Sequence, residues 1–188
     1  MTRIQNEYFM KREQLLGLLG SYKTTDAHEA KMQQKIIDFV MANEDCFERS
    51  HLAGHITGSA WILDEMGSRV LLIHHVKLDK WLQPGGHADG ETDILKVAMK
   101  EALEETGLEL APLSSEIFDV DIHTIPTRKE VPEHLHYDIR FAFKCRDSSG
   151  SFAANREVKS ARWIGLDEVA KYNSDISVMR MVEKSMGS

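Results

Sequence analysis

Cysteine, long apolar runs and positive charge are all scarce in this sequence of 188 residues. The only cysteines are Cys46 and Cys145, which stand far apart and in no CxxC or Cys/His spacing. This spacing argues against a disulfide framework and a structural zinc site, so we expect two buried thiols. No stretch approaches the roughly 18 apolar residues of a membrane span, and the charged N-terminus lacks the apolar core of a signal peptide. We therefore expect a cytoplasmic protein with no membrane partner.

Basic residues are outnumbered by acidic ones. The chain has 23 Lys and Arg against 30 Asp and Glu, which gives a formal net charge of −7. A protein that holds a nucleic-acid backbone needs a broad basic surface, and this composition does not indicate one. An extended nucleic acid is thus not an expected partner. The hydrophobic content of 42% is enough to build the core of one ordinary domain with an appendage.

The spacing of apolar residues changes near residue 50. Before this point they recur at helical intervals in two stretches, and Asp26 followed by Glu29 matches a capping box that opens the second stretch. After this point, GHITGSAWIL and RVLLIHHV favour two strands joined by a hairpin turn at Gly67. We predict an N-terminal helical extension over residues 1–50 and a main domain over residues 51–188.

The main domain mixes strands with helices. Three further segments, EIFDVDIHTI, LHYDIRFAFKC and EVKSARWI, have the composition of strands, and the tail from Leu166 favours one or two short helices. Between them, DILKVAMKEALEETG places Ile94, Ala98 and Ala102 at helical spacing. This predicted helix ends at Gly107, which is a typical C-cap. The fold class that we predict is α+β, a mixed β-sheet flanked by helices.

The predicted helix carries three acids on one edge. At about 100° per residue, Glu101, Glu104 and Glu105 fall within an arc of about 100°. Like charges four residues apart destabilise a helix by about 0.2–0.5 kcal/mol, and Lys100 alone does not neutralise three acids. Clustered carboxylates together with a backbone carbonyl, such as that of Gly86, favour a hard divalent cation. The alternative is a solvated acidic face, which is the usual fate of Glu-rich helices.

The segment PGGHADGETDILKVAMKEALEETGL resembles the Nudix box, whose pattern is G-x5-E-x7-R-E-U-x-E-E-x-G-U with U apolar. Two positions depart from that pattern, because Lys100 stands where the family has Arg and Thr92 stands at the first Glu. Either Glu91 or Asp93, which flank Thr92, is expected to take over the role of that glutamate. The similarity extends over roughly residues 50 to 170. The matching positions of the box are Gly86, Glu101, Ala102, Glu104, Glu105, Gly107 and Leu108.

The resemblance implies a Nudix-type α/β/α sandwich and a metal-dependent hydrolase. Such an enzyme would cleave a diphosphate linkage in a nucleoside diphosphate linked to another moiety, X, by attack of water at phosphorus. The implied cofactor is Mg²⁺, with Mn²⁺ as an alternative, and the implied partner is a small molecule that contains a diphosphate. The implied metal ligands are Glu101, Glu104, Glu105 and the carbonyl group of Gly86.

The resemblance also implies catalytic roles for Glu104, Glu105 and Lys100. Glu104 would be a further metal ligand or the general base, and Lys100 would orient the glutamates. Arg makes this contact with a rigid bidentate fork, whereas Lys offers a point charge, so we expect a looser cluster of acids. Glu157, at the start of the last predicted strand, is a second candidate for the base, although a surface acid is the simpler interpretation.

Four residues outside the helix are candidates for binding substrate. Arg128 and Lys129 lie in a Pro-flanked loop and suit a terminal phosphate, although a solvated loop is the alternative. His87 lies within the glycine loop, where bracing of the turn is its alternative role. His136 alternates with His134 on one predicted strand, so the two side chains share a face.

The histidines of that face have a second interpretation. His134 and His136, with His123 from the preceding predicted strand, would form a second metal site or a phosphate contact. For any one of these histidines, a hydrogen-bonded structural role is the simpler interpretation.

Two other functions compete with hydrolysis. An isopentenyl-diphosphate-isomerase-like enzyme shares the resemblance, but it usually needs a cysteine in its pocket, and neither cysteine lies in the box or its glycine loop. A non-catalytic nucleotide-sensing Nudix domain is the second alternative, and the intact acids argue against it. The N-terminal helices are expected to cap the pocket, to form the interface of a homodimer or only to cover the sheet.

Overall fold

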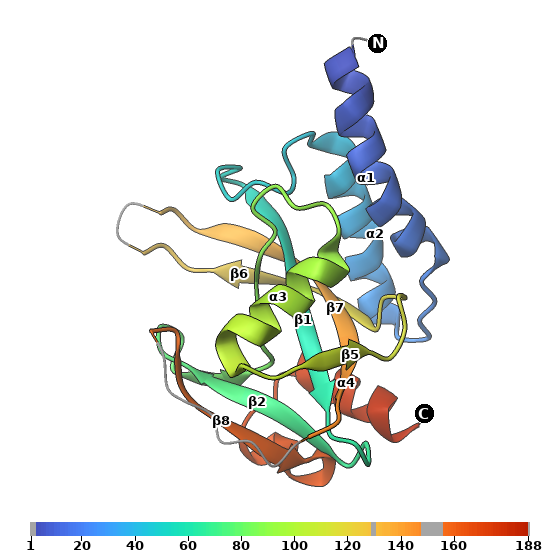
Figure 1. The fold of residues 1–188 in the computed structure, drawn as a ribbon. Coiled ribbons are helices and arrows are strands. Elements are labelled where there is room, and N and C mark those ends of the chain that lie inside the picture. The colour runs from blue at the N-terminus through green and yellow to red at the C-terminus, as the bar shows by residue number, and fades with distance from the viewer. Residues whose placement is uncertain (1–2, 129–130, 148–155, 188) are drawn as a thin grey trace.

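The computed structural model describes residues 3–128, 131–147 and 156–187, with residues 3–11 as backbone alone. Figure 1 shows helices packed on a strongly curled sheet. The helices are α1 (Arg3–Ser21), α2 (Ala27–Ala42), α3 (Ile94–Thr106), the 3-10 helix η1 (Leu166–Lys171) and α4 (Ile176–Met186). The strands are β1 (Gly54–Leu63), β2 (Arg69–His75), β3 (Lys80–Leu82), β4 (Gly85–His87), β5 (Leu110–Pro112), β6 (Asp119–Ile125), β7 (His134–Cys145) and β8 (Val158–Gly165).

The sheet is mixed, as the sequence predicts, and β1 lies at its centre. β1 pairs in parallel with β7 along its whole length, from Gly54 opposite Leu135 to Leu63 opposite Lys144. It pairs antiparallel with β2 and with the short β4, whereas β6 and β5 pair with β7 and β8 pairs with β2. The longest predicted strands are confirmed. The short strands β3, β4 and β5 carried no clear alternation in the sequence.

Local signals account for the ends of the main helices. The side chain of Asp93 caps α3 by accepting a hydrogen bond from the Lys96 N–H at 3.3 Å, and Gly107 ends the helix in the left-handed region with φ of 71°. Glycine suits that position because it has no Cβ to clash. Asp26 caps α2 in the same way, accepting from the Glu29 N–H at 2.7 Å. The hairpin turn at Gly67, with φ of 68°, is also as predicted.

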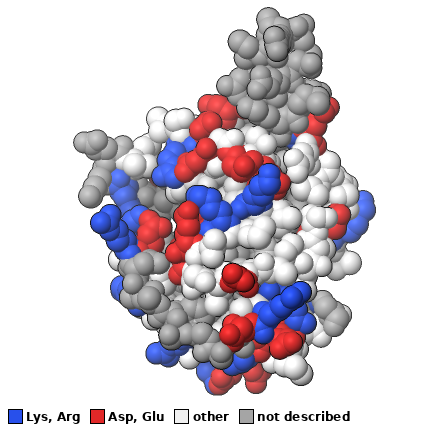
Figure 2. Space-filling view, viewed as in Figure 1, with Lys and Arg blue, Asp and Glu red and all other residues white. Residues whose placement is uncertain are grey.

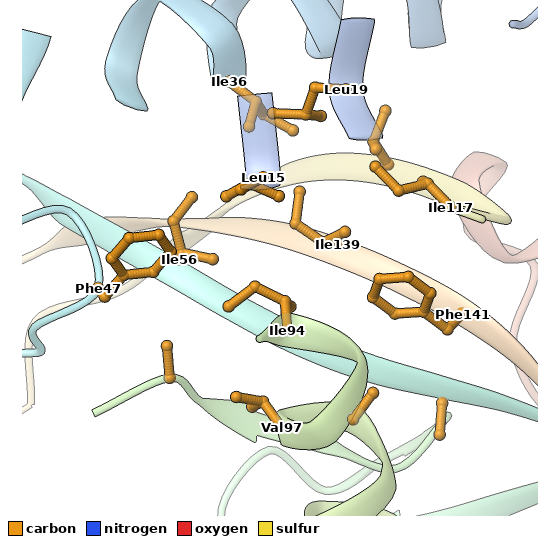
Figure 3. Close-up of a cluster of buried hydrophobic side chains, with 14 of the residues drawn as sticks. Leu15, Leu19, Ile36, Phe47, Ile56, Ile94, Val97, Ile117, Ile139 and Phe141 are labelled. Atoms are coloured by element: carbon orange, nitrogen blue, oxygen red, sulfur yellow. The ribbon is translucent and has the colours of Figure 1, made fainter. Parts of the chain in front are cut away.

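Helices cover both faces of the sheet, which confirms the predicted α/β/α sandwich. In Figure 1, α3 lies across β1, while α2 lies beside β6 and β7. One apolar core lies on the face of the sheet that α3 covers. It includes side chains of the N-terminal helices, such as Leu15 and Ile36, and of α3, such as Ile94 (Figure 3). The helices α4 and η1 cover the opposite face around Trp61. The N-terminal helices thus cover the sheet, while the division into two domains at residue 50 stays a prediction.

A buried ionic network joins the N-terminal helices to the C-terminus. Glu29 does not complete the predicted capping box, because its carboxylate instead accepts from Tyr22 at 2.6 Å and from the Lys184 ammonium group of α4 at 2.6 Å. Asp119 of β6 accepts from Lys184 at 2.7 Å and from Nε and Nη2 of Arg180, both at 2.8 Å. Long-range charges therefore outweigh the local cap at Glu29. None of the helices within the described ranges has the length and apolar character needed to cross a membrane.

Candidate active site

The three acids of α3 meet in one cleft. The cleft has a volume of about 280 Å³ and is lined by Glu101, Glu104, Glu105, Arg156 and Glu157. Because a water molecule occupies about 30 Å³ in the liquid, this space has room for an ion together with several waters. On the face of the molecule that carries α3, Figure 2 shows acidic and basic side chains side by side. The solvated-face alternative does not describe all three acids, since Glu105 is only 6% exposed.

Lys100 lies beside two of the acids. Its Nζ lies 3.3 Å from an oxygen of Glu101 and 3.5 Å from an oxygen of Glu104. Both negative charges raise the pKa of Lys100, and the charge of Glu101 has the larger effect. The Lys100 side chain is 65% exposed and the Glu104 side chain is 58% exposed, so these contacts are solvent-screened and add little to stability. The ammonium group therefore lies within reach of both carboxylates.

Glu105 is the most enclosed acid of the cleft. Burial raises its pKa to about 8, a shift that the hydrogen bond from the Gly85 N–H at 3.0 Å opposes and the neighbouring Glu101 increases. Burial also raises the pKa of Glu101, and Lys100 opposes that shift. Carboxyl groups with raised pKa values mark a site where a positive charge is needed to keep them ionised.

The glycines of β4 permit a close approach of the strand to its neighbours. A Cβ added at Gly86 would lie 2.4 Å from Oε2 of Glu101, and one added at Gly85 would lie 2.3 Å from the hydroxyl of Ser59 on β1. Successive residues of a strand point to opposite faces, so Gly86 meets α3 while Gly85 meets the other side of the sheet. The Gly-Gly pair therefore lets β4 fit between the acidic helix and β1.

The loop around Thr92 shows how the departure from the box is accommodated. The side chain of Glu91 accepts hydrogen bonds from the Thr92 N–H at 2.8 Å and from the Asp93 N–H at 3.0 Å. Asp93 in turn caps α3. Both acids that flank Thr92 thus brace the loop and the start of the helix.

Glu157, which sequence reasoning placed second to a surface role, reaches the same cleft as the acids of α3. Antiparallel pairing of β8 with β2 brings it there, and its backbone carbonyl accepts from the Val76 N–H at 2.7 Å. The Glu157 side chain is 53% exposed and lies 3.5 Å from the Lys77 ammonium group. Arg156 is a cleft residue that sequence reasoning missed, because no motif precedes it.

Arg128 lies close to this end of the cleft. Its guanidinium donates to the backbone carbonyl of Lys77 at 2.6 Å, and Lys77 is the residue that contacts Glu157. Lys129, the other phosphate-binding candidate of that loop, lies outside the described residues. Arg156 thus lines the cleft, Lys77 pairs with Glu157 of the cleft, and Arg128 contacts the backbone of Lys77.

The two candidate histidines gather away from the acids that line the cleft. The rings of His87 and His136 lie 5.0 Å apart, and both lie about as close to His55, at 5.0 and 4.9 Å. Burial lowers the pKa of His87 to about 4 and that of His136 to about 2, so both are neutral at pH 7. His123 and His134 also contact His136, which agrees with the predicted shared face.

The cysteines lie in the apolar core, as predicted. Cys46 and Cys145 are free and buried, and burial raises the pKa of Cys46 to about 12. Neither is among the residues that line the carboxylate cleft. The cysteine that an isomerase would use is thus not supplied to this cleft by these two residues.

Comparison with known proteins identifies two relatives of similar sequence. The asymmetrical bis(5'-nucleosyl)-tetraphosphatase of Rattus norvegicus is 33% identical over 101 residues, which is 53% of this chain and 61% of the relative. The corresponding protein of Mus musculus is 32% identical over the same shares. The chain therefore matches only about three fifths of the length of these relatives.

Solved structures show the same fold. A binary complex of a C. elegans Ap4A hydrolase has a TM-score of 0.52 at 16% identity and covers 70% of this chain and 95% of its own. A UDP-X diphosphatase has a TM-score of 0.53 at 14% identity and covers 97% of this chain and 95% of its own, so its likeness includes the N-terminal helices. Residues 55–182 match the NUDIX domain profile, and this chain therefore belongs to the Nudix family.

Proposed function

We propose that this protein hydrolyses a diphosphate linkage in a nucleoside diphosphate linked to another moiety, X, by attack of water at phosphorus. The observation that carries this proposal is the convergence of Glu101, Glu104, Glu105 and Glu157 in one cleft. Family membership and fold support it. A fold alone hosts many functions, so the chemistry of the cleft is the stronger argument.

The donor set of the cleft fits a hard divalent cation. Several carboxylates, one of them buried with a pKa raised to about 8, surround a space with room for water, and Lys100 does not neutralise them all. Glu101, Glu104, Glu105 and the carbonyl of Gly86 would hold Mg²⁺ or Mn²⁺, which prefer such oxygen ligands. When bound, the cation neutralises phosphate charge and helps to activate water.

The residues of the cleft then divide the work by exposure. Glu105 and Glu101 are the enclosed acids, so they suit the fixed part of the site, and Gly85 orients Glu105 through its N–H. Glu104 and Glu157 are both more than half exposed, and a carboxylate that faces water is the one that can accept a proton from it. Lys100 holds Glu101 and Glu104 together.

The basic groups around the acids suit the substrate. Lys77, Arg128 and Arg156 lie at one end of the cleft, where they would contact the terminal phosphate and offset the charge of the diphosphate. His87 and His136, the other two candidates for binding substrate, cluster with His55 and are not assigned to the diphosphate. The relatives and neighbours named for tetraphosphatase, Ap4A hydrolase and UDP-X diphosphatase activity support a nucleoside with a phosphate chain as the common part.

A magnesium-dependent hydrolysis assay with chromatographic separation of the products tests the proposal, because cleavage of a diphosphate between two substituents gives two phosphate esters rather than free phosphate. The panel contains nucleotide sugars, dinucleoside polyphosphates, NAD-like compounds and oxidised nucleotides, each with Mg²⁺, with Mn²⁺ and with a chelator. We expect cleavage of at least one compound that needs the added cation. Tight binding of nucleotides without turnover of any would instead favour a nucleotide sensor, and rearrangement of isopentenyl diphosphate without phosphate release would favour an isomerase.

A further inference from the structure

Five of the nine histidines of the chain meet on one face of the sheet. The parallel register of β1 and β7 sets His55 directly opposite His136, and the antiparallel register of β7 and β6 sets His136 opposite His123. Antiparallel pairing of β4 with Thr57 of β1 adds His87 on the same face. The members of this cluster are His55, His87, His123, His134 and His136.

Three of these histidines point ring nitrogens at one another. One nitrogen of each of His55, His87 and His136 lies within 4.8 Å of the other two. Their ring centroids form a nearly equilateral triangle with sides of 4.9, 5.0 and 5.0 Å. A tetrahedral Zn²⁺ binds histidine nitrogens at about 2.0–2.1 Å, which sets the nitrogens roughly 3.3 Å apart. Small rotations of the rings therefore bring all three nitrogens to bonding distance.

Three ring nitrogens of this triangle are buried without a hydrogen-bond partner. His55 is 3% exposed, and neither of its ring nitrogens makes a hydrogen bond of normal geometry. Nε2 of His136 is likewise buried without a hydrogen-bond partner. Buried polar groups in folded proteins are nearly always paired, so unpaired nitrogens that face one another point to a ligand.

We propose that His55, His87 and His136 form a three-histidine site for a zinc-class transition-metal ion, separate from the carboxylate cleft. Each ligand comes from a different strand of the sheet, so backbone pairing fixes the geometry. Three nitrogen ligands leave a fourth position on Zn²⁺ for water or another small ligand.

The chemistry of the donors separates this site from that of the acids. Neutral imidazole suits Zn²⁺, Co²⁺, Ni²⁺ and Cu²⁺, whereas Mg²⁺ prefers the oxygens of carboxylates and water. The strand β4 lies between the two sites, because Gly86 faces Glu101 on α3 and the next residue, His87, faces the opposite way.

The charged groups next to His87 act in opposite directions. Arg49 is the cation that lowers the pKa of His87, and the guanidinium forms an ion pair with Asp89, whose carboxylate has the opposite effect on that histidine. His134 is oriented by its Nδ1, which lies 2.8 Å from the carbonyl of Pro132. Its ring lies 5.1 Å from that of His55, so it borders the site without belonging to the triangle.

Metal binding by the untagged full-length chain tests the proposal. The protein is stripped with a chelator, dialysed against Zn²⁺ with excess Mg²⁺ and analysed for retained zinc, and Co²⁺ is titrated in parallel to record its visible absorption. We expect one retained Zn²⁺ per chain and the intense Co²⁺ bands of a four-coordinate site with nitrogen ligands. Substitution of His55→Gln or His136→Gln should weaken Zn²⁺ binding by about 100-fold or more.

Control variants separate this site from the other histidines and from the acids. His123 belongs to the same cluster but lies outside the triangle, so the His123→Gln variant should retain the Zn²⁺. The Glu105→Gln variant, changed in the carboxylate cleft, should retain it as well. Circular dichroism on each variant shows that the fold is kept, and His87→Gln provides a third test should His55→Gln fail to fold. Absence of retained Zn²⁺ in the wild type, or equal retention in folded His136→Gln and His87→Gln variants, would overturn the proposal.

Discussion

Glu105 and Gly85, 20 residues apart in the chain, are joined by a hydrogen bond of 3.0 Å from the glycine N–H to the buried carboxylate. This contact ties the acidic helix to the strand of the glycine loop, so the two halves of the Nudix box form one unit. It also fixes the direction of a carboxyl group whose pKa burial raises to about 8. The protein itself therefore holds the Glu105 side chain in place.

The substitutions Glu104→Gln and Glu105→Gln should each lower turnover without unfolding the protein. Each amide keeps the shape of the side chain but removes the charge that would hold a cation, and we expect a loss of kcat of about 100-fold or more, equal to about 2.7 kcal/mol. Glu116→Gln is the matched control, because Glu116 is exposed and does not line the cleft. Steady-state rates and thermal melting on the three variants give the answer. Near-normal rates in Glu105→Gln would refute the metal assignment.

Gly86→Ala should disturb the acid cluster through Glu101. The added Cβ would lie 2.4 Å from Oε2 of Glu101, and the flexible end of that side chain must move aside. We expect the Mg²⁺ concentration for half-maximal activity to rise by about tenfold, in line with the loss of one positioning contact. Gly17→Ala is the control, since a Cβ there meets nothing within 4 Å. Unchanged Mg²⁺ dependence in Gly86→Ala would show that Glu101 does not bind the ion.

Lys100→Arg tests the departure from the box. The lysine contacts Glu101 and Glu104 at 3.3 and 3.5 Å as a point charge, whereas arginine offers a planar fork for both. We expect Lys100→Arg to keep activity and to lower the Mg²⁺ requirement, and Lys100→Met to raise that requirement. Metal titrations of the rate measure both effects. An Mg²⁺ requirement raised equally in both variants would mean that the ammonium group itself is needed.

Asp119 should make stability depend on acid pH. Burial alone would raise its pKa, but the hydrogen bonds from Arg180 and the charges of Arg140 and Lys184 lower the pKa from 3.8 to about 2. Because the folded pKa lies below the unfolded value, the stabilisation is present above about pH 3.8 and is lost as the pH falls through about 2. Urea unfolding at pH values from 2 to 7 measures the change in the free energy of unfolding. A pKa shift of this size corresponds to about 2 kcal/mol.

The substitution Asp119→Asn provides the matched test of that network. It removes one carboxylate from Arg140 and Arg180, which keep Asp138 and Glu29 as partners, so we expect a loss of about 2–3 kcal/mol at pH 7 and a flatter acid profile. Asp38→Asn, on the exposed surface of α2, should change little. An Asp119→Asn variant as stable as the wild type at pH 7 would show that the network does not stabilise the fold.

Features governed by neighbouring residues were predictable from the sequence. The ends of α3 follow from Asp93 and Gly107, and the hairpin turn follows from Gly67. The shared face of His134 and His136 follows from strand alternation and is confirmed by ring centroids 5.2 Å apart. Each of these depends on a backbone conformation or a period that a short segment determines by itself.

Features created by pairing of distant segments were not predictable in this way. His55 joins the histidine cluster only because β1 pairs in parallel with β7. This pairing sets His55 opposite His136, which is 81 positions further along the chain. Glu157 reaches the cleft because β8 pairs with β2. Glu29 looked like part of a helix cap, but the Lys184 ammonium group from the far end of the chain binds its carboxylate. A single sequence shows periodicity but not which strands become neighbours.

Hydrolysis in ¹⁸O-labelled water tests the central claim most directly. The substrate that the panel assay identifies is turned over with Mg²⁺, and ³¹P NMR and mass spectrometry locate the label in the products. We predict that one ¹⁸O enters a phosphate group, that the reaction requires the divalent cation, and that Glu105→Gln abolishes most of it. Label found only in the X moiety, or turnover that persists in Glu105→Gln with a chelator present, would contradict the account.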